Sequence, residues 1–288
     1  MLYNLRDILS VAKENKFAVP AFNCSNEIFL KGILEACESE KAPVIIEVHP
    51  NELKFGTESF IRTLRAKAGE TVMPICIHLD HGSSFEQAME AIRCGFTSVM
   101  IDASKKSFEE NIELTKKVVE AAHSVGVSVE AELGTIGGTG EDGNACTDNI
   151  IYTRAEDVKA FVEATNVDAL AIAIGTAHGI YPKDQKPHLR IDILKEIRAI
   201  TDIPLVLHGG SDNPDSEVAA AVEAGVQKIN ISSDIKKSFF KECREVLKNE
   251  KLMIPRQIFI PSLESMKETV IHKIRLFNDN DKIKCFYN

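Results

Sequence analysis

The sequence has no excess of basic residues: 43 aspartates and glutamates outnumber 34 lysines and arginines, giving a formal net charge of −9 at pH 7. A nucleic-acid-binding face needs clustered lysines and arginines, so this balance argues against such a partner. Long apolar runs are missing too, and none approaches the roughly 20 residues that cross a membrane. We therefore expect no nucleic-acid partner and no membrane partner. Small phosphorylated substrates stay open, because backbone amides and one or two cations can bind them.

Paired cysteine motifs are also missing from the sequence. The seven cysteines are odd in number, scattered, and never spaced as C-x-x-C. This pattern is typical of free, mostly buried thiols in a reducing compartment rather than of a disulfide framework. The first residues, Met1–Asp7, are amphipathic and contain no apolar signal-peptide region. The sequence therefore predicts a cytoplasmic protein.

A histidine stands at the end of each of three short apolar runs. The runs end in His81-Gly82, His178-Gly179 and His208-Gly209. Short apolar runs closed by glycine are typical of strands buried on both faces of a parallel sheet. Because the carboxyl ends of parallel strands gather on one face, we expect the three imidazoles to converge there. Three histidines with an open fourth position describe a catalytic zinc site.

Strand-like and helix-like segments alternate along the chain, eight of each, which favours a single (β/α)₈ TIM barrel of the α/β class. The main rival, an open doubly wound sheet, usually has fewer strands and a glycine-rich loop after the first. Here Ala18–Asn23 is followed by Cys24-Ser25-Asn26 instead. We expect residues 1–288 to form one domain, with an extra N-terminal capping helix in 1–15 and a C-terminal helical extension and tail in 255–288. The C-terminal helix itself is predicted over Pro261–Phe277.

The predicted strands are 18–23, 43–48, 73–79, 98–102, 127–132, 169–174, 204–208 and 227–231. The predicted helices between them are 26–40, 57–68, 84–94, 108–125, 155–165, 191–200, 214–224 and 233–247.

Every predicted strand ends in a polar or ionisable residue, and barrel active sites lie at these carboxyl ends. Asp80 lies beside His81, where it either orients the histidine or acts as an acid/base group. His78 is expected to be a buried, hydrogen-bonded histidine. The residues expected to share this face are Asn23, Glu47, His49, Asp80, His81, Asp102, Glu132, His178, His208 and Asn230.

Two further segments suggest how a phosphate and a lid could be built. His208–Ser211 and Asn230–Ser233 end the seventh and eighth predicted strands, and each opens a helix. Free amides at helix starts bind anions, and barrels often place a phosphate after these two strands. Gly134–Gly143 carries five glycines and no apolar periodicity, so we expect a lid whose Glu141 swings in as a second acid/base group.

Together, Asp-His-Gly, Met-Ile-Asp-Ala-Ser, Val-Glu-Ala-Glu-Leu-Gly, the glycine-rich lid, Gly-Thr-Ala-His-Gly and Leu-His-Gly-Gly-Ser resemble the class II, metal-dependent ketose-bisphosphate aldolases, including the fructose- and tagatose-1,6-bisphosphate enzymes. The resemblance runs from about residue 1 to residue 277. It implies that His81, His178 and His208 bind one catalytic Zn²⁺, and that Asp102 and Glu132 are ligands of a second or alternate divalent ion.

The resemblance also implies that Asp80 is the acid/base group on the C4 oxygen and that Glu141 handles the proton at C3. It implies a Na⁺ or K⁺ ion near the phosphate, and a homodimer or homotetramer. The residues implied to bind the dihydroxyacetone phosphate end are Asn23, Gly179, Lys183, Gly209, Gly210, Ser211, Asn230, Ser232 and Ser233.

Four departures from the family pattern concern the aldehyde half of the substrate. Asp212 stands where the family usually has a glycine, and the lid is one residue longer than usual. Pro261-Ser262-Leu263 replaces a Pro-Ala-Arg that many fructose-bisphosphate members use for the second phosphate, although tagatose-type relatives lack that arginine too. Glu47–Asn51 is also atypical. We hypothesise that Leu263 shifts preference toward substrates without the distal phosphate.

The sequence thus predicts reversible cleavage of a ketose 1,6-bisphosphate, or a related ketose 1-phosphate, into dihydroxyacetone phosphate and an aldehyde. Alternatives are a Schiff-base aldolase using Lys228, a zinc hydrolase on the same histidines, and an inactive barrel that serves as a binding subunit.

Overall fold

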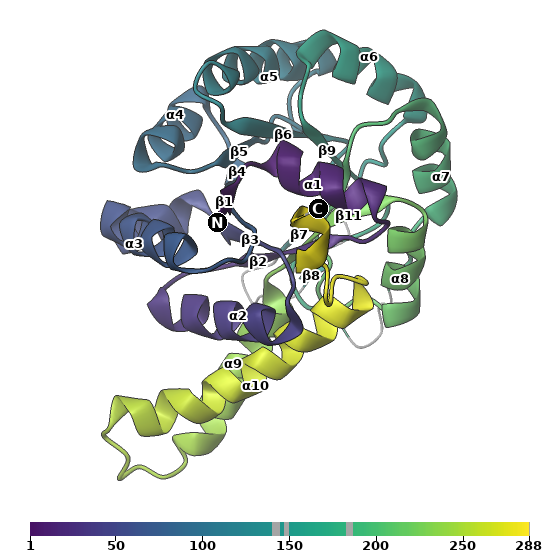
Figure 1. The fold of residues 1–288 in the computed structure, drawn as a ribbon. Helices are drawn as coiled ribbons and strands as arrows, with labels where there is room; N and C mark the ends of the chain where they lie inside the picture. Colours follow the sequence, from purple (N-terminus) through teal and green to yellow (C-terminus); the bar gives the residue numbers. More distant parts are fainter. Residues whose placement is uncertain (140–144, 147–149, 183–186, 288) are drawn as a thin grey trace.

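The structure, a computed structural model, describes residues 1–139, 145–146, 150–182 and 187–287. Within these residues, eight parallel strands close into a barrel with helices between successive strands (Figure 1). The ring closes where β11 (Val226–Ile231) pairs with β2 (Val19–Asn23). The predicted TIM barrel is therefore confirmed. The other barrel strands are β3 (Val44–Val48), β4 (Ile75–Gly82), β5 (Ser98–Ile101), β6 (Ser128–Leu133), β9 (Ala169–Ile172) and β10 (Leu205–Leu207).

Several of the surrounding helices begin where a side chain accepts from backbone N–H groups that have no partner inside the helix. Asn26 caps α2 (Glu27–Glu40), and Ser84 caps α4 (Phe85–Cys94). Ser107 forms a reciprocal capping box with Glu110 at the start of α5 (Phe108–His123). The later helices of the ring are α6 (Ala155–Thr165), α7 (Ile191–Ile200) and α8 (Asp215–Glu223).

The helix after β3 begins earlier than predicted. In α3 (Pro50–Glu70), Pro50 occupies the first turn, and His49 accepts at Nδ1 from the Asn51 N–H. At Thr57 the backbone leaves the helical region, with φ 60° and ψ 175°, and the predicted helix 57–68 is the part after this kink. The additional turn brings Asn51 and Glu52 to the cavity described below.

The amino-terminal end of the barrel is covered by both ends of the chain. The extra N-terminal helix, α1 (Leu5–Glu14), buries an apolar face against the inside of the barrel. An unpredicted strand, β1 (Leu2–Tyr3), pairs with the start of β4. A 3₁₀ turn, η1 (Ile283–Phe286), places Phe286 edge-on against Tyr3 with ring centroids 5.4 Å apart. The Met1 ammonium donates to the carbonyl of Met73, and the Tyr287 hydroxyl donates to that of Val72.

The C-terminal helical extension and the helix after the last barrel strand together form an arm. α9 (Ser233–Val246) and α10 (Pro255–Leu276) pack together and project from the barrel (Figure 1). α10 begins at Pro255, so Pro261 lies inside the helix and not at its start as predicted. Several large apolar side chains of the arm are exposed: Phe240, Leu247, Met253, Ile254 and Ile260.

Leu263 does not face a substrate site. Its side chain is 6% exposed and packs between α10 and α2, where a Cβ added to Gly32 would lie 2.9 Å from its Cδ2 atom. The hypothesis that Leu263 replaces a phosphate-binding arginine is therefore wrong for this chain, because the position is part of the packing between two helices.

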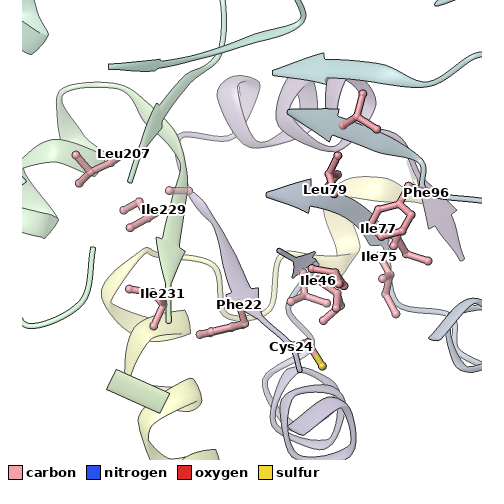
Figure 2. Packing of buried hydrophobic residues seen from close by; sticks show 14 of the residues in the cluster. Phe22, Cys24, Ile46, Ile75, Ile77, Leu79, Phe96, Leu207, Ile229 and Ile231 are labelled. Carbon is pink, nitrogen blue, oxygen red and sulfur yellow. The ribbon is translucent and has the colours of Figure 1, made fainter. Parts of the chain in front are cut away.

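Alternate residues of each barrel strand point to opposite sides of the wall. Outward-facing side chains such as Ile46, Ile77 and Ile229 are buried between the strands and the helices (Figure 2). Inside the barrel, the layer against α1 is apolar and includes Ile45 and Val206. The buried inward-facing residues that follow along the strands are polar: Glu47, His78, Ser98, Glu130 and Lys228.

Candidate active site

A cavity of about 580 Å³ opens at the carboxyl ends of the strands. The structure brings most of the sequence-predicted site residues together around it. Glu141 and Lys183 lie outside the described residues. The predicted residues that line the cavity are Asn23, His49, Asp80, His81, Asp102, Glu132, His178, Gly179, Gly209, Ser211, Asn230, Ser232 and Ser233, and His208 lies directly beside them.

Three imidazoles converge at this cavity. The ring centroid of His81 lies 4.9 Å from that of His178 and 4.7 Å from that of His208. One ring nitrogen from each of the three lies within 4.8 Å of the others. The convergence predicted from the three strand-end histidines is therefore present.

The hydrogen bonds of two of these rings fix which nitrogens face each other. A carboxylate can only accept, so His81 donates from Nδ1 to Asp102 at 2.9 Å, and His208 donates from Nε2 to Glu130 at 2.7 Å. The remaining nitrogens, His81 Nε2 and His208 Nδ1, are 3.1 Å apart. When both rings are neutral, these two nitrogens carry lone pairs that point at each other, and a metal ion near both would stabilise that arrangement. Without an ion, a proton on His81 Nε2 takes its place and donates to His208 Nδ1. The donor set therefore fits a metal ion of the imidazole-binding type.

The charges around the histidines also favour a cation. Burial opposes protonation of His81, but Asp80 and Asp102 outweigh it and raise the pKa of His81 to about 10. Burial, followed by the charges of His81 and His208, lowers the pKa of His178 to about 3. His178 is therefore a neutral imidazole, the form that binds metals.

A second group of possible ligands shares His81. Ligand atoms of His81, Asp102 and Glu132 also lie within 4.8 Å of one another. Burial, and then the charge of Asp102, raises the pKa of Glu132 to about 8. Among the described residues, Glu132 Oε2 is buried without a hydrogen-bond partner, so this oxygen fits a cation or a hydroxyl group.

Asp80 is held on both carboxylate oxygens. It is 5% exposed and accepts from Asn23 Nδ2 at 2.7 Å and from Asn230 Nδ2 at 3.3 Å. Burial alone would raise the pKa of Asp80, but His81 and His208 lower it well below its ordinary value. Asp80 is therefore an ionised group, fixed at the cavity and able to accept a proton. Its Oδ1 lies 3.8 Å from His81 Nε2.

On the predicted phosphate side, Ser211 Oγ accepts from the N–H groups of Ser232 and Asp234 at 3.2 and 3.3 Å. These bonds join the loop after β10 to the start of α9. Gly210 packs against β11 rather than facing the cavity. Its N–H donates to the Asn230 carbonyl at 3.0 Å, and a Cβ added to it would lie 2.4 Å from the Ile229 side chain. The prediction that Gly210 offers its amide to a phosphate therefore does not hold in this structure.

Asp212, which stands where a glycine is usual, has a backbone φ of 58°. Aspartate tolerates this left-handed region better than most residues. Its side chain accepts from the Tyr181 N–H at 2.8 Å, which links the loop after β9 to the loop after β10. The departure from the pattern therefore keeps the backbone conformation and adds a contact between two loops.

Lys228 has no access to the cavity. Its side chain is fully buried, and Nζ lies 2.7 Å from Glu47 and 2.9 Å from Glu130. Although burial opposes the charge, these two carboxylates raise the pKa of Lys228 above its ordinary value. A protonated, enclosed amine is not a nucleophile, so the geometry disfavours the Schiff-base alternative. His78 is buried and bonds to Ser98 at 2.8 Å, as expected.

Sequence reasoning missed part of the cavity wall. Asn51 and Glu52 come from the unpredicted first turn of α3, and Lys105 follows β5. Lys236 lies on the first turn of α9, three residues after Ser233 and so on the same helix face. This spacing was visible in the sequence and could have placed Lys236 at the site.

Comparisons with known proteins identify the family. The chain matches the family described as "Fructose-bisphosphate aldolase class-II" over residues 3–282, and it belongs to that family. It is 43% identical to the fructose-bisphosphate aldolase of Staphylococcus epidermidis, covering 98% of this chain and 99% of the relative. It is 41% identical to the probable fructose-bisphosphate aldolase of Bacillus subtilis, with the same coverage.

Solved structures of aldolases share the fold. The crystal structure of the YdjI aldolase from Escherichia coli K12 superposes with a TM-score of 0.85 at 32% identity, over 98% of this chain and 100% of that chain. The fructose-bisphosphate aldolase of Campylobacter jejuni superposes with a TM-score of 0.83 at 26% identity, over 98% and 97%. The protein is thus a metal-dependent aldolase, a lyase whose family reaction yields dihydroxyacetone phosphate and an aldehyde. Within the described residues, no helix is long and apolar enough to cross a membrane.

Proposed function

We propose that this aldolase is zinc-dependent and that His81, His178 and His208 hold the ion. The observation that carries the proposal is the 3.1 Å separation of His81 Nε2 and His208 Nδ1, with His178 beside them. When bound there, a divalent ion supplies Lewis-acid chemistry by polarising the substrate carbonyl. Asp102 and Glu132 would serve a second or alternate divalent position that shares His81.

Asp80 is the acid/base group of the proposed reaction. In the cleavage direction its ionised carboxylate accepts the proton of the C4 hydroxyl while the C3–C4 bond breaks, and in condensation it returns that proton. Asn23 and Asn230 hold the carboxylate in place through their amide N–H groups. Glu141, from the lid, would exchange the proton at C3.

We propose that the dihydroxyacetone phosphate end binds where the loops after β9 and β10 meet the start of α9. Gly179, Gly209, Ser211, Ser232 and Ser233 line this part of the cavity. The start of α9 adds the positive end of a helix dipole, which favours an anion. Lys183 would add a cation, and a Na⁺ or K⁺ ion would lie nearby.

For the distal end we propose a second phosphate, as in fructose or tagatose 1,6-bisphosphate. Two lysines at the cavity wall, Lys105 and Lys236, support a second anionic group, as does the 43% identity to a relative named fructose-bisphosphate aldolase. The test is kcat/KM for the two bisphosphates against the matching ketose 1-phosphates. Comparable values for both kinds of substrate would contradict the proposal.

Metal removal tests the zinc proposal. Dialysis against a chelator should abolish cleavage, and one equivalent of zinc per chain should restore it. An aldolase should also exchange a C–H proton of dihydroxyacetone phosphate with solvent, which a zinc hydrolase on the same histidines would not do. Full activity of metal-free protein would refute zinc dependence.

We further propose a homo-oligomer, a dimer or tetramer, assembled through the arm. Exposed apolar side chains near its tip, Leu247, Met253 and Ile254, are 47%, 83% and 46% exposed and would be covered by a second copy. Light scattering tests this: replacing Met253 and Ile254 with serine should lower the mass to that of one chain. A reducing, cytoplasmic location is proposed from six free cysteines: Cys24, Cys37, Cys76, Cys94, Cys243 and Cys285.

A further inference from the structure

A layer of charged side chains fills the barrel directly below the three histidines. Glu47, Glu130 and Lys228 point inward from three different strands, and each has 0% of its surface exposed. Their strand neighbours Ile46 and Ile229 point outward into the apolar layer between strands and helices (Figure 2). The charged layer is thus enclosed on its sides by apolar packing and on one end by the apolar layer over α1.

In the described part of the chain, Glu130 connects this layer to the three cavity histidines. Glu130 Oε1 accepts from His208 Nε2 at 2.7 Å. Lys228 Nζ lies 3.2 Å from the same oxygen and 2.9 Å from Oε2 of Glu130. On its other side, Lys228 pairs with Glu47 Oε1 at 2.7 Å. His78 Nε2 approaches Glu130 Oε2 at 3.5 Å. Glu130 is therefore the member that touches a cavity histidine, while Glu47 reaches it only through Lys228.

Stability does not account for this layer. Buried ion pairs lose about as much by desolvation as they gain by attraction, and apolar replacements of similar volume are often neutral or more stable. The interior of this barrel accepts apolar residues one layer lower, where Ile45 and Val206 face α1. A functional role for the charges is therefore a better physical explanation than stability.

Glu130 determines which nitrogen of His208 faces the cavity. Because a carboxylate has no proton to donate, it requires the proton of the neutral imidazole to be on Nε2. The lone pair is then on Nδ1, the atom 3.1 Å from His81 Nε2. Lys228 donates to Oε1 of Glu130 and its Nζ lies 2.9 Å from Oε2, so it contacts both oxygens and limits rotation of the carboxylate.

We propose that Glu130 is a positioning residue, anchored by Lys228, that fixes the tautomer and orientation of His208 so that Nδ1 faces the metal position. The inference deepens the proposed metal-dependent function and rests on it. Lys228, the candidate for a Schiff-base nucleophile, is thereby assigned a supporting role in metal binding.

The deciding variant is Glu130→Gln in the full chain. Glutamine keeps the shape but offers an amide N–H₂ group to Nε2, which favours the opposite tautomer with the proton on Nδ1. Zinc affinity, measured by competition with a chromophoric chelator, should fall by about 10- to 100-fold. The matched control is Glu47→Gln, the same change in the same layer against the same lysine but without contact to His208. Its zinc affinity should stay within about threefold of wild type, because the expected loss follows the histidine contact.

A second measurement needs no metal. Long-range proton–nitrogen NMR of the metal-free enzyme should show His208 protonated at Nε2 in wild type and in Glu47→Gln, and at Nδ1 in Glu130→Gln. If Glu130→Gln does not fold, Glu130→Asp replaces it; a shorter acceptor should keep the wild-type tautomer and weaken zinc binding.

The outcomes separate the two proposals. Absence of zinc binding by wild type would refute zinc dependence, while the NMR tautomer still decides the role of Glu130. Wild-type zinc affinity and tautomer in folded Glu130→Gln would overturn the inference. An equal loss in Glu47→Gln would also overturn it, because the layer would then act only as a structural unit.

Discussion

Removing the Asp80 carboxylate should abolish turnover without removing the metal site. A positioned acid/base group contributes roughly a factor of 10² to 10⁴, which corresponds to about 2.7–5.4 kcal/mol in the barrier. Asp80→Ala should lower kcat by that factor, because no other described carboxylate accepts from both Asn23 and Asn230. His81, His178 and His208 keep their nitrogens, so zinc content should stay at the wild-type value.

The same substitution has a calculable effect on folding. Two amide groups lose a charged acceptor, and an unsatisfied buried donor costs about 1–3 kcal/mol. Water entering the space left by the carboxylate would satisfy part of that loss, since the site opens to the cavity. We therefore expect the free energy of unfolding to change by less than about 3 kcal/mol, and the protein to stay folded.

The assay combines cleavage of fructose 1,6-bisphosphate, coupled to detection of dihydroxyacetone phosphate, with zinc analysis and urea unfolding of the same sample. A loss of less than tenfold in kcat would refute the acid/base role and favour simple orientation of His81, 3.8 Å away. A loss of zinc in parallel with rate would show that Asp80 acts through the metal site.

Three further predictions concern other parts of the molecule. Lys236→Met should lower kcat/KM for fructose 1,6-bisphosphate by about 10- to 100-fold and leave kcat/KM for the matching 1-phosphate unchanged, because a charge-assisted hydrogen bond is worth about 1.5–3 kcal/mol. The control is Lys237→Met, which removes an ion pair to Asp212 at 3.5 Å. Equal losses on both substrates would contradict a distal-phosphate role for Lys236. Leu263→Arg should destabilise the protein by about 3 kcal/mol or more in urea unfolding, since it places a charge in apolar packing. The ratio of kcat/KM values for the two substrates should stay unchanged. A changed ratio would show that residue 263 faces the substrate site. Burial raises the pKa of Asp279 well above its ordinary value, so the native state binds a proton more tightly than the unfolded state. Stability is therefore lost as pH rises above the unfolded-state pKa of about 3.9. Asp279→Asn should be more stable than wild type at pH 8, with a gain that shrinks toward pH 4, and a pH-independent difference would contradict this.

The barrel could be predicted because its signals are local. Apolar runs such as the one ending at His208 and glycines such as Gly209 mark buried parallel strands by composition alone. Because the carboxyl ends of barrel strands gather on one face, the sequence also predicted that Asp80, His81 and His178 lie together. These inferences needed only the order of elements and the geometry that every barrel shares.

The errors arose where tertiary contacts decide. Leu263 was assigned to a substrate site by a motif, but the face that a helical residue presents depends on where the helix packs. The turn beginning at Pro50 was missed because a few residues carry no helical periodicity. β1 pairs with β4 across more than 70 residues, which no local pattern records.

The charged layer was only partly visible in the sequence. Lys228 stands in an apolar strand, which marks it as unusual, but its partners Glu47 and Glu130 are far away along the chain. Only closure of the ring between β11 and β2 brings the strand that carries Lys228 close to β3, which carries Glu47 and lies on the other side of β2. The pairing of buried charges is a property of the closed barrel and not of any one strand.

Both ends of the chain lie on the face opposite the cavity, where Met1 and Tyr287 contact the adjacent carbonyls of Met73 and Val72. An enzyme tethered to a bead or electrode through either end would present its catalytic mouth outward, away from the support. The same proximity makes the chain a candidate for circular permutation, with a short peptide joining the old ends and new ends opened in an exposed connection between two ring helices.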